Sequence, residues 1–120
     1  MKENFLISDT ISRFLEDHKI TDVKMIDLKG KSTSADYMVI GTGTSTRQIN
    51  AVAELLAMEL KNLGIENIIR EGDSSCDWVL IDIGSTVVHL FKQEMRAFYN
   101  LEELWASREK LKNSDLEINH

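Results

Sequence analysis

Three aspartates lie in or just before predicted strands and are candidate metal ligands for nucleotidyl transfer: Asp36, Asp77 and Asp82. Two-metal catalysis needs clustered carboxylates that bridge ions about 3.5–4 Å apart. On a strand, such carboxylates must lie at positions i and i+2, because successive side chains point to opposite faces of the sheet. The separation of Asp77 and Asp82 is odd, so they point to opposite faces, and Asp36 stands alone before its strand. These residues therefore predict no metal site and no enzyme.

A glycine-rich segment, Gly41-Thr42-Gly43-Thr44-Ser45, precedes a predicted helix and is a candidate phosphate site. Such a turn can bind phosphate through free backbone N–H groups and the helix dipole. The segment lacks the third glycine of G-x-G-x-x-G and the G-K-[ST] of a Walker A motif. We favour a structural interpretation, in which the glycines form a tight turn and Ser45 caps the helix, with Gln48 at capping-box spacing. The alternative is a nucleotidyltransferase with a degenerate site at Gly41, Gly43 and Asp82.

The cysteine and histidine residues indicate neither a disulfide nor a zinc site. Cys76 is the single cysteine, and no histidine lies near it in the sequence to activate it as a nucleophile. His18, His89 and His120 are far apart and lack HExxH spacing. We predict no metal and no cofactor.

The region from Asp77 to Phe91 is predicted to form a β-hairpin that serves as a docking surface for a partner. Its loop, Gly84-Ser85, has glycine first, as a two-residue type II′ turn prefers. A two-residue loop fixes the register of the two strands. The predicted pairs are Ile83 with Thr86, Asp82 with Val87, Ile81 with Val88, Leu80 with His89, Val79 with Leu90, and Trp78 with Phe91.

The two faces of this hairpin differ in composition. One face is aliphatic and suited to packing on helices, and the other mixes aromatic rings with one acid and one imidazole. Trp is enriched at binding hot spots, and large exposed apolar patches mark partners. Alternatively, a C-terminal helix covers Trp78 and Phe91, and His89 bonds to Asp82 or a backbone carbonyl; residue chemistry leaves these interpretations even. The aliphatic face holds Val79, Ile81, Ile83, Val88 and Leu90. The mixed face holds Trp78, Leu80, Asp82, Val87, His89 and Phe91.

The hydrophobic pattern predicts the elements that must position these residues. Apolar side chains recur at helical spacing over residues 5–18 and from Ser45 to Leu63, and Gly64 follows as a C-terminal cap. A further helix is predicted over residues 94–105. Consecutive hairpins with one crossover helix imply an α+β domain, in which helices pack against a mixed β-sheet of about five strands. The predicted strands are residues 23–28, 37–40, 65–70, 78–83 and 87–91.

Length and composition predict one cytoplasmic domain. The 120 residues suffice for a single core, and no apolar run approaches the roughly 20 residues of a membrane span. The N-terminus has no signal-peptide pattern. The net charge of −6 disfavours direct binding to DNA or bare RNA, because such affinity comes largely from Lys and Arg. The charge suits a basic protein partner instead.

Several segments, taken in order, resemble the ribosomal silencing factor family, also called RsfS or Iojap. The resemblance runs from about the first helix to Trp105, so we assign residues 1–106 to the family domain and 107–120 to a polar tail. One departure is Gly84-Ser85-Thr86, which replaces a more acidic turn. The segments are ADYMVI at 35–40, GTGTS at 41–45, EG at 71–72, DWVLIDIG at 77–84, VVH at 87–89 and FYNLEELW at 98–105.

The resemblance implies a nucleotidyltransferase-like fold without demonstrated catalysis. It also implies binding to large-subunit ribosomal protein fourteen on the large ribosomal subunit, at the surface that faces the small subunit. Bound there, a family member hinders subunit joining and represses translation when nutrients are limiting. The matching positions predict Trp78, Leu80, Asp82 and His89 as partner-binding residues. A third interpretation is a homodimer in which the mixed face meets its own copy.

Overall fold

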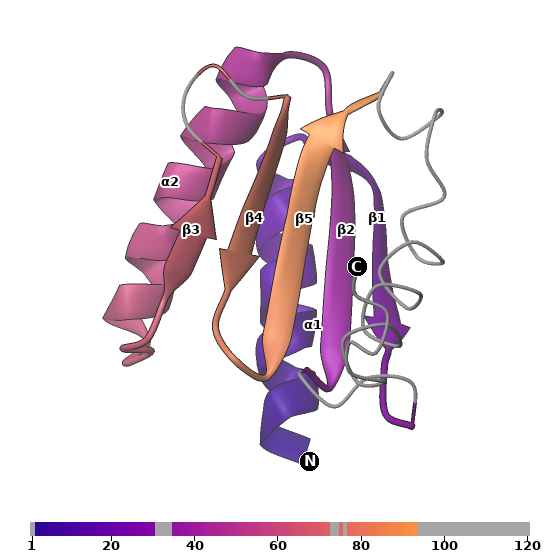
Figure 1. Ribbon diagram of the computed structural model, residues 1–120, viewed down its shortest axis with the longest axis vertical. Helices are drawn as coiled ribbons and strands as arrows, with labels where there is room; N and C mark the ends of the chain where they lie inside the picture. The colour runs from indigo at the N-terminus through magenta and orange to yellow at the C-terminus, as the bar shows by residue number, and fades with distance from the viewer. Residues whose placement is uncertain (1, 31–34, 73–74, 76, 94–120) are drawn as a thin grey trace, which may run out of the picture.

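The described chain folds into two helices and five strands (Figure 1). The computed structural model describes residues 2–30, 35–72, 75 and 77–93. The helix predicted over 94–105 and the tail at 107–120 lie outside the described residues. The elements in chain order are α1 (Lys2–Asp17), β1 (Thr21–Asp27), β2 (Tyr37–Gly43), α2 (Thr46–Asn62), β3 (Ile69–Glu71), β4 (Trp78–Asp82) and β5 (Thr86–Lys92).

The strands form one mixed sheet with the spatial order β1-β2-β5-β4-β3. β2 and β5 run parallel at its centre, whereas the other three neighbouring pairs are antiparallel. A parallel pair needs a long crossover connection, and the chain between β2 and β5 supplies one that includes α2. The predicted α+β class with a five-stranded mixed sheet is confirmed, and the finer likeness to nucleotidyltransferases stays a prediction.

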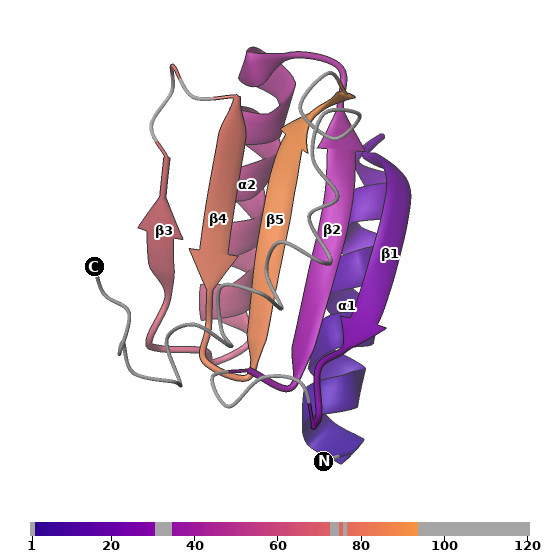
Figure 2. The same cartoon turned by 45° about the vertical axis from the view of Figure 1, so that its right-hand side comes forward.

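Both helices cover the same face of the sheet, as the two ribbon views agree (Figures 1 and 2). α1 packs mainly against β1 and β2, and α2 against β4 and β5. Each Val, Leu or Ile side chain that is fully buried here contributes about 1.5–3 kcal/mol to stability. This layer is the main hydrophobic core. Its buried members are Ile11, Leu15, Ile20, Val39, Ile49, Val52, Ala53, Leu56, Leu60, Val79, Ile81, Val88 and Leu90.

A second buried cluster lies on the opposite face of the sheet. β2 and β5 provide most of it, and Ile26 and Leu80 pack against its edge. The middle of the sheet is therefore buried on both faces, which explains why β2 is apolar without alternation. The buried members of this cluster are Leu28, Ala35, Met38, Ile40, Val87 and Phe91.

The glycines of the GTGTS segment lie in a strand, which corrects our prediction of a tight turn. β2 continues to Gly43, and Gly41 pairs with Leu90 of β5. A Cβ on Gly41 would lie 2.5 Å from Cγ2 of Ile20, and one on Gly43 would clash with Cγ2 of Ile49. Glycine is required here because neighbouring side chains approach the backbone closely.

β3 is shorter and begins later than predicted. We expected a strand over residues 65–70, but only Ile69–Glu71 pair with β4. Ile65 and Ile68 instead pack partly buried against the main core. A short apolar run indicates that its side chains are buried, but not whether the backbone is a strand or irregular. The spacing of these residues therefore could not show where β3 begins.

Candidate functional site

The β4–β5 hairpin has the register predicted from its two-residue loop. Trp78 pairs with Phe91, Leu80 with His89, and the intervening and following pairs match as well. The Ile83 N–H donates to the Thr86 carbonyl at 3.0 Å, which closes the hairpin beside Gly84-Ser85. The two faces therefore separate as expected.

The aliphatic face packs on the helices. Four of its five residues are buried in the main core, and Ile83 packs partly buried against it. The prediction that this face serves structure is confirmed.

The mixed face is exposed on only part of its area. Trp78 is 36% exposed, and Leu80 and Asp82 are partly exposed. In contrast, His89 is 2% exposed and Phe91 is fully buried. Of the four predicted partner-binding residues, Trp78, Leu80 and Asp82 thus reach solvent from β4, whereas His89, on the neighbouring strand β5, is buried.

His89 forms a hydrogen bond with Trp78, a partner that neither interpretation of the sequence named. The indole Nε1–H of Trp78 donates to Nδ1 of His89 at 3.1 Å. The ring centroids are 5.7 Å apart at an interplanar angle of 32°. An acceptor role requires an unprotonated Nδ1, so this hydrogen bond selects the tautomer. The contact fixes the orientation of the tryptophan ring at the surface.

Asp82 has a structural role within the hairpin. Its Oδ1 accepts a hydrogen bond from the Gly84 N–H at 2.8 Å. Carboxylates commonly stabilise a turn by bonding the backbone two residues on. This contact holds the carboxylate near the loop, at the opposite end of β4 from Trp78.

Two residues of β3 extend the exposed surface, and sequence reasoning missed them. Ile69 pairs with Asp82 and Glu71 with Leu80, so both point to the same face as the mixed residues. Ile69 is 57% exposed. Apolar and charged side chains alternate over Ile69, Arg70 and Glu71, and this pattern could have indicated that Ile69 and Glu71 share one face of a strand. The local sequence did not reveal which strand they pair with. We call the exposed set Ile69, Glu71, Trp78, Leu80 and Asp82 the β3–β4 patch.

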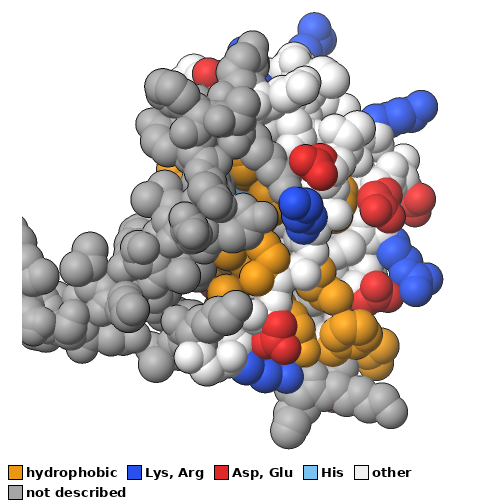
Figure 3. Space-filling model, turned by 90° about the vertical axis from the view of Figure 1, so that its right-hand side faces the viewer, with side chains coloured by type: hydrophobic (Ala, Val, Ile, Leu, Met, Phe, Trp, Pro, Cys, Tyr) orange, Lys and Arg blue, Asp and Glu red, His pale blue; other side chains and the backbone are white. Residues whose placement is uncertain are grey.

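Charge distinguishes this patch from the β1 edge. Seen from that edge, acidic and basic side chains are interspersed (Figure 3). Along β1 itself the exposed residues Asp22, Lys24 and Asp27 alternate in sign. The β3–β4 patch contains two acids and no base. Arg70, between Ile69 and Glu71, points to the helix side and donates to Oδ1 of Asn50 at 2.7 Å.

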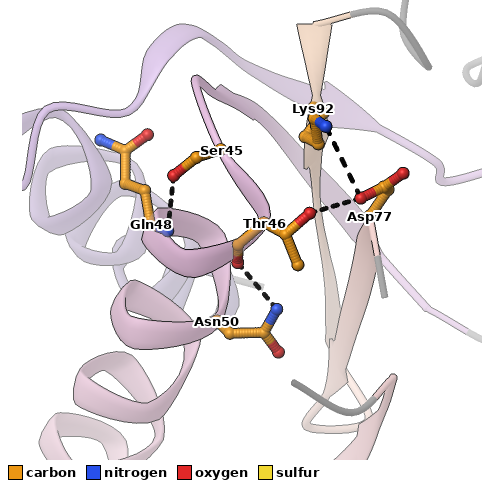
Figure 4. A network of polar contacts seen from close by, with 6 residues as sticks. All are labelled: Ser45, Thr46, Gln48, Asn50, Asp77 and Lys92. Carbon is orange, nitrogen blue, oxygen red and sulfur yellow. Dashed lines mark hydrogen bonds and ion pairs between the residues drawn. The ribbon is translucent and has the colours of Figure 1, made fainter. Parts of the chain in front are cut away.

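Polar groups at the N-terminus of α2 already have hydrogen-bond partners within the chain (Figure 4). Ser45 Oγ accepts from the Gln48 N–H at 3.0 Å, which confirms the predicted cap. The Thr46 hydroxyl donates to the Asp77 carboxylate, which also lies 3.9 Å from the Lys92 ammonium. A carboxylate at this point already complements the positive end of the helix dipole. The arrangement favours the structural interpretation of the segment over a phosphate site.

Asp77 and Asp82 have different partners at opposite ends of β4. Within residues 2–30, 35–72, 75 and 77–93, no three His, Cys, Asp or Glu side chains come together as metal ligands would. In the same ranges, neither helix is long and apolar enough to cross a membrane.

Comparison with known proteins identifies the family. Residues 5–120 match the family model for "Ribosomal silencing factor during starvation", a span that includes the residues we assigned to a tail. The chain is 42% identical to Ribosomal silencing factor RsfS of Haemophilus influenzae over 92 residues, which are 77% of this chain and 90% of that protein. It is 47% identical to the protein of the same name from Zymomonas mobilis over 91 residues, 76% of this chain and 68% of that one.

A solved structure agrees with this result. The crystal structure of a Chromobacterium violaceum protein superposes with a TM-score of 0.76 at 36% identity, covering 82% of both chains. The family match over nearly the whole sequence and the shared fold lead to one conclusion: this chain belongs to the ribosomal silencing factor family.

Proposed function

We propose that this chain binds large-subunit ribosomal protein fourteen on the large ribosomal subunit and sterically blocks association with the small subunit. Translation is thereby repressed in the cytoplasm when nutrients are limiting. Membership of the ribosomal silencing factor family supports ribosome association. The observation that carries the surface assignment is the partly exposed ring of Trp78, held by a buried His89.

Trp78 is the anchor of the proposed interface. Aromatic hot spots contribute most when the ring is already ordered before binding, because less side-chain entropy is lost. The hydrogen bond from Nε1 to His89 supplies that order. Leu80 adds apolar contact, Asp82 adds negative charge at the loop end, and His89 acts through Trp78.

The mechanism needs no catalytic step. An acidic protein with a net charge of −6 is attracted to a basic ribosomal protein, and complementary charge speeds encounter. Once docked, the chain occupies space that the small subunit requires. We assign this activity to residues 1–106.

The test is co-sedimentation of Trp78→Ala with isolated large subunits. Truncating an interface anchor costs about 2 kcal/mol or more, so we expect affinity to fall at least about thirtyfold. Met58→Ala is the matched control, because Met58 is 57% exposed on α2, on the other side of the sheet. A folded Trp78→Ala variant that co-sediments like the wild type would show that this surface is not the interface.

Off the ribosome, we propose that the mixed face can meet a second copy of the chain. Dimerisation and ribosome binding would then compete for Trp78. Sedimentation equilibrium at several concentrations measures the dimer, and Trp78→Ala should remain monomeric. A dimer that is unchanged by Trp78→Ala would place the contact elsewhere.

A further inference from the structure

A pocket of about 200 Å³ opens between the edge strand β3 and the exposed end of β4. Among the residues that the structure describes, it is lined by Glu71, Gly72, Trp78 and Leu80. It therefore contains an indole ring, an aliphatic side chain and a carboxylate within one hollow of the β3–β4 patch. None of the sequence-based site predictions included Glu71.

The size of the pocket indicates what it can hold. Sites for drug-sized ligands and cofactors measure about 300–1,000 Å³, so this pocket is too small for that class. A water molecule occupies roughly 30 Å³ of liquid, so the pocket exceeds the space of a few waters. A single long side chain of a docking partner is the occupant that fits this range.

The chemistry of the walls selects a cation. The side-chain carboxylate of Glu71 has no hydrogen-bond or ion-pair partner among the described residues, and Arg70 beside it points to the helix side. A carboxylate next to the face of a tryptophan combines the two features that bind guanidinium groups, namely a bidentate acceptor and a cation–π surface. The planar arginine fork suits both at once, whereas lysine is a compact point charge.

The ring that forms one wall is fixed before binding. Trp78 donates to His89, and Leu80 packs against the second buried cluster. The wall is therefore pre-ordered, and a docked side chain would not have to immobilise it.

We propose that this pocket receives one arginine side chain of the protein partner, with Trp78 stacking on the guanidinium and Glu71 as its counter-ion. This assignment rests on the proposed function for the identity of the partner. It moves the main electrostatic contact from Asp82, which bonds Gly84 in its own loop, to Glu71 on β3.

The first experiment measures binding of Glu71→Gln to isolated large subunits. Glutamine keeps the shape of the side chain and removes its charge, so we expect affinity to fall about tenfold and to become less sensitive to salt. Glu54→Gln is the matched control, because Glu54 is exposed on α2 and makes the same change in net charge. Unchanged affinity of folded Glu71→Gln would overturn the proposal.

The second experiment tests the pocket without the ribosome. N-acetyl-arginine methylamide is titrated into the full chain while the indole Nε1–H signal of Trp78 is followed by NMR, with Trp78→Phe to assign that signal. We expect a saturable shift with the arginine probe, a much smaller shift in Glu71→Gln, and none with N-acetyl-norleucine methylamide. Equal responses to the two probes, or an undiminished response in Glu71→Gln, would overturn the proposal that this pocket binds arginine.

The two experiments separate the two proposals. If wild-type protein fails to bind large subunits but the arginine probe gives the Glu71-dependent shift, the pocket stands and the ribosomal partner is wrong. If large subunits bind normally and the probe gives no such shift, the pocket is wrong and the function stands. A concentration-dependent dimer that Glu71→Gln abolishes, together with unchanged ribosome binding, would identify the occupant as a second copy and overturn the assignment to the ribosomal partner.

Discussion

Trp78 and His89 show how a buried residue can determine what an exposed residue does. His89 is 2% exposed and is too deep to contact a docked protein in this conformation. Its Nδ1 nevertheless accepts the hydrogen bond that orients the tryptophan. A substitution at His89 should therefore affect binding through the order of Trp78, without loss of a direct contact.

A double-mutant cycle measures this coupling at the residue scale. His89→Phe removes the acceptor and Trp78→Phe removes the donor. We expect the destabilisation by His89→Phe to be smaller in the Trp78→Phe background by about 0.5–1.5 kcal/mol, the usual net worth of a hydrogen bond. Urea unfolding of the four proteins gives the values. Additivity within about 0.3 kcal/mol would mean that the hydrogen bond contributes nothing to stability.

Among the elements, β2 is constrained most tightly by its surroundings. It is buried along all of its length and joins the β1 edge to the central strand β5. Gly41 lies where Ile20 and Leu90 approach the backbone from the helix side. The packing of β2 thus requires that Gly41 has no side chain, as much as it requires the apolar residues of the strand.

Gly41→Ala should destabilise the fold without touching the proposed interface. The added Cβ would lie 2.5 Å from Cγ2 of Ile20, closer than packed carbon atoms tolerate. Overpacking of this kind costs about 1–3 kcal/mol. The penalty should shrink in an Ile20→Ala background, where Cγ2 is absent. Thermal and urea unfolding measure both effects, and an equal penalty in the two backgrounds would locate the strain elsewhere.

At the scale of the whole molecule, the proposed activity is steric and depends on order of addition. The protein should reduce joining when it is mixed with large subunits before small subunits are added. It should act more weakly on ribosomes that have already joined, because the small subunit then covers the same surface. Light scattering or gradient sedimentation follows the reaction, with Trp78→Ala as the inactive variant and Met58→Ala as the control. Equal inhibition in both orders would argue against a steric block.

The hairpin was predictable in full because its determinants are local. A two-residue loop fixes the register, and the register fixes which side chains share a face. The sequence therefore placed Trp78 and His89 together on one side. It could not show that they bond to each other, because burial of the histidine depends on neighbours far away in the chain.

The errors in predicting β3 and the glycines of β2 arise from contacts between residues far apart in the sequence. β3 pairs with β4 over Ile69–Glu71 only, and nothing within that short segment specifies its partner. For this reason Glu71 was absent from the predicted site. The glycines of β2 were misassigned for a similar reason, since their role is set by Ile20 and Ile49, which come from other elements.

The position of β5 at the centre of the sheet has a consequence for synthesis. β5 is the last strand of the described chain, yet it separates the pair β1–β2 from the pair β4–β3. A nascent chain that lacks residues 86–92 cannot join the two halves, so its apolar strands have no common core. Non-local pairing of this kind delays folding and leaves intermediates prone to aggregate. The proposed docking residues on β4 can therefore take up their final positions only after residues 86–92 have been synthesised.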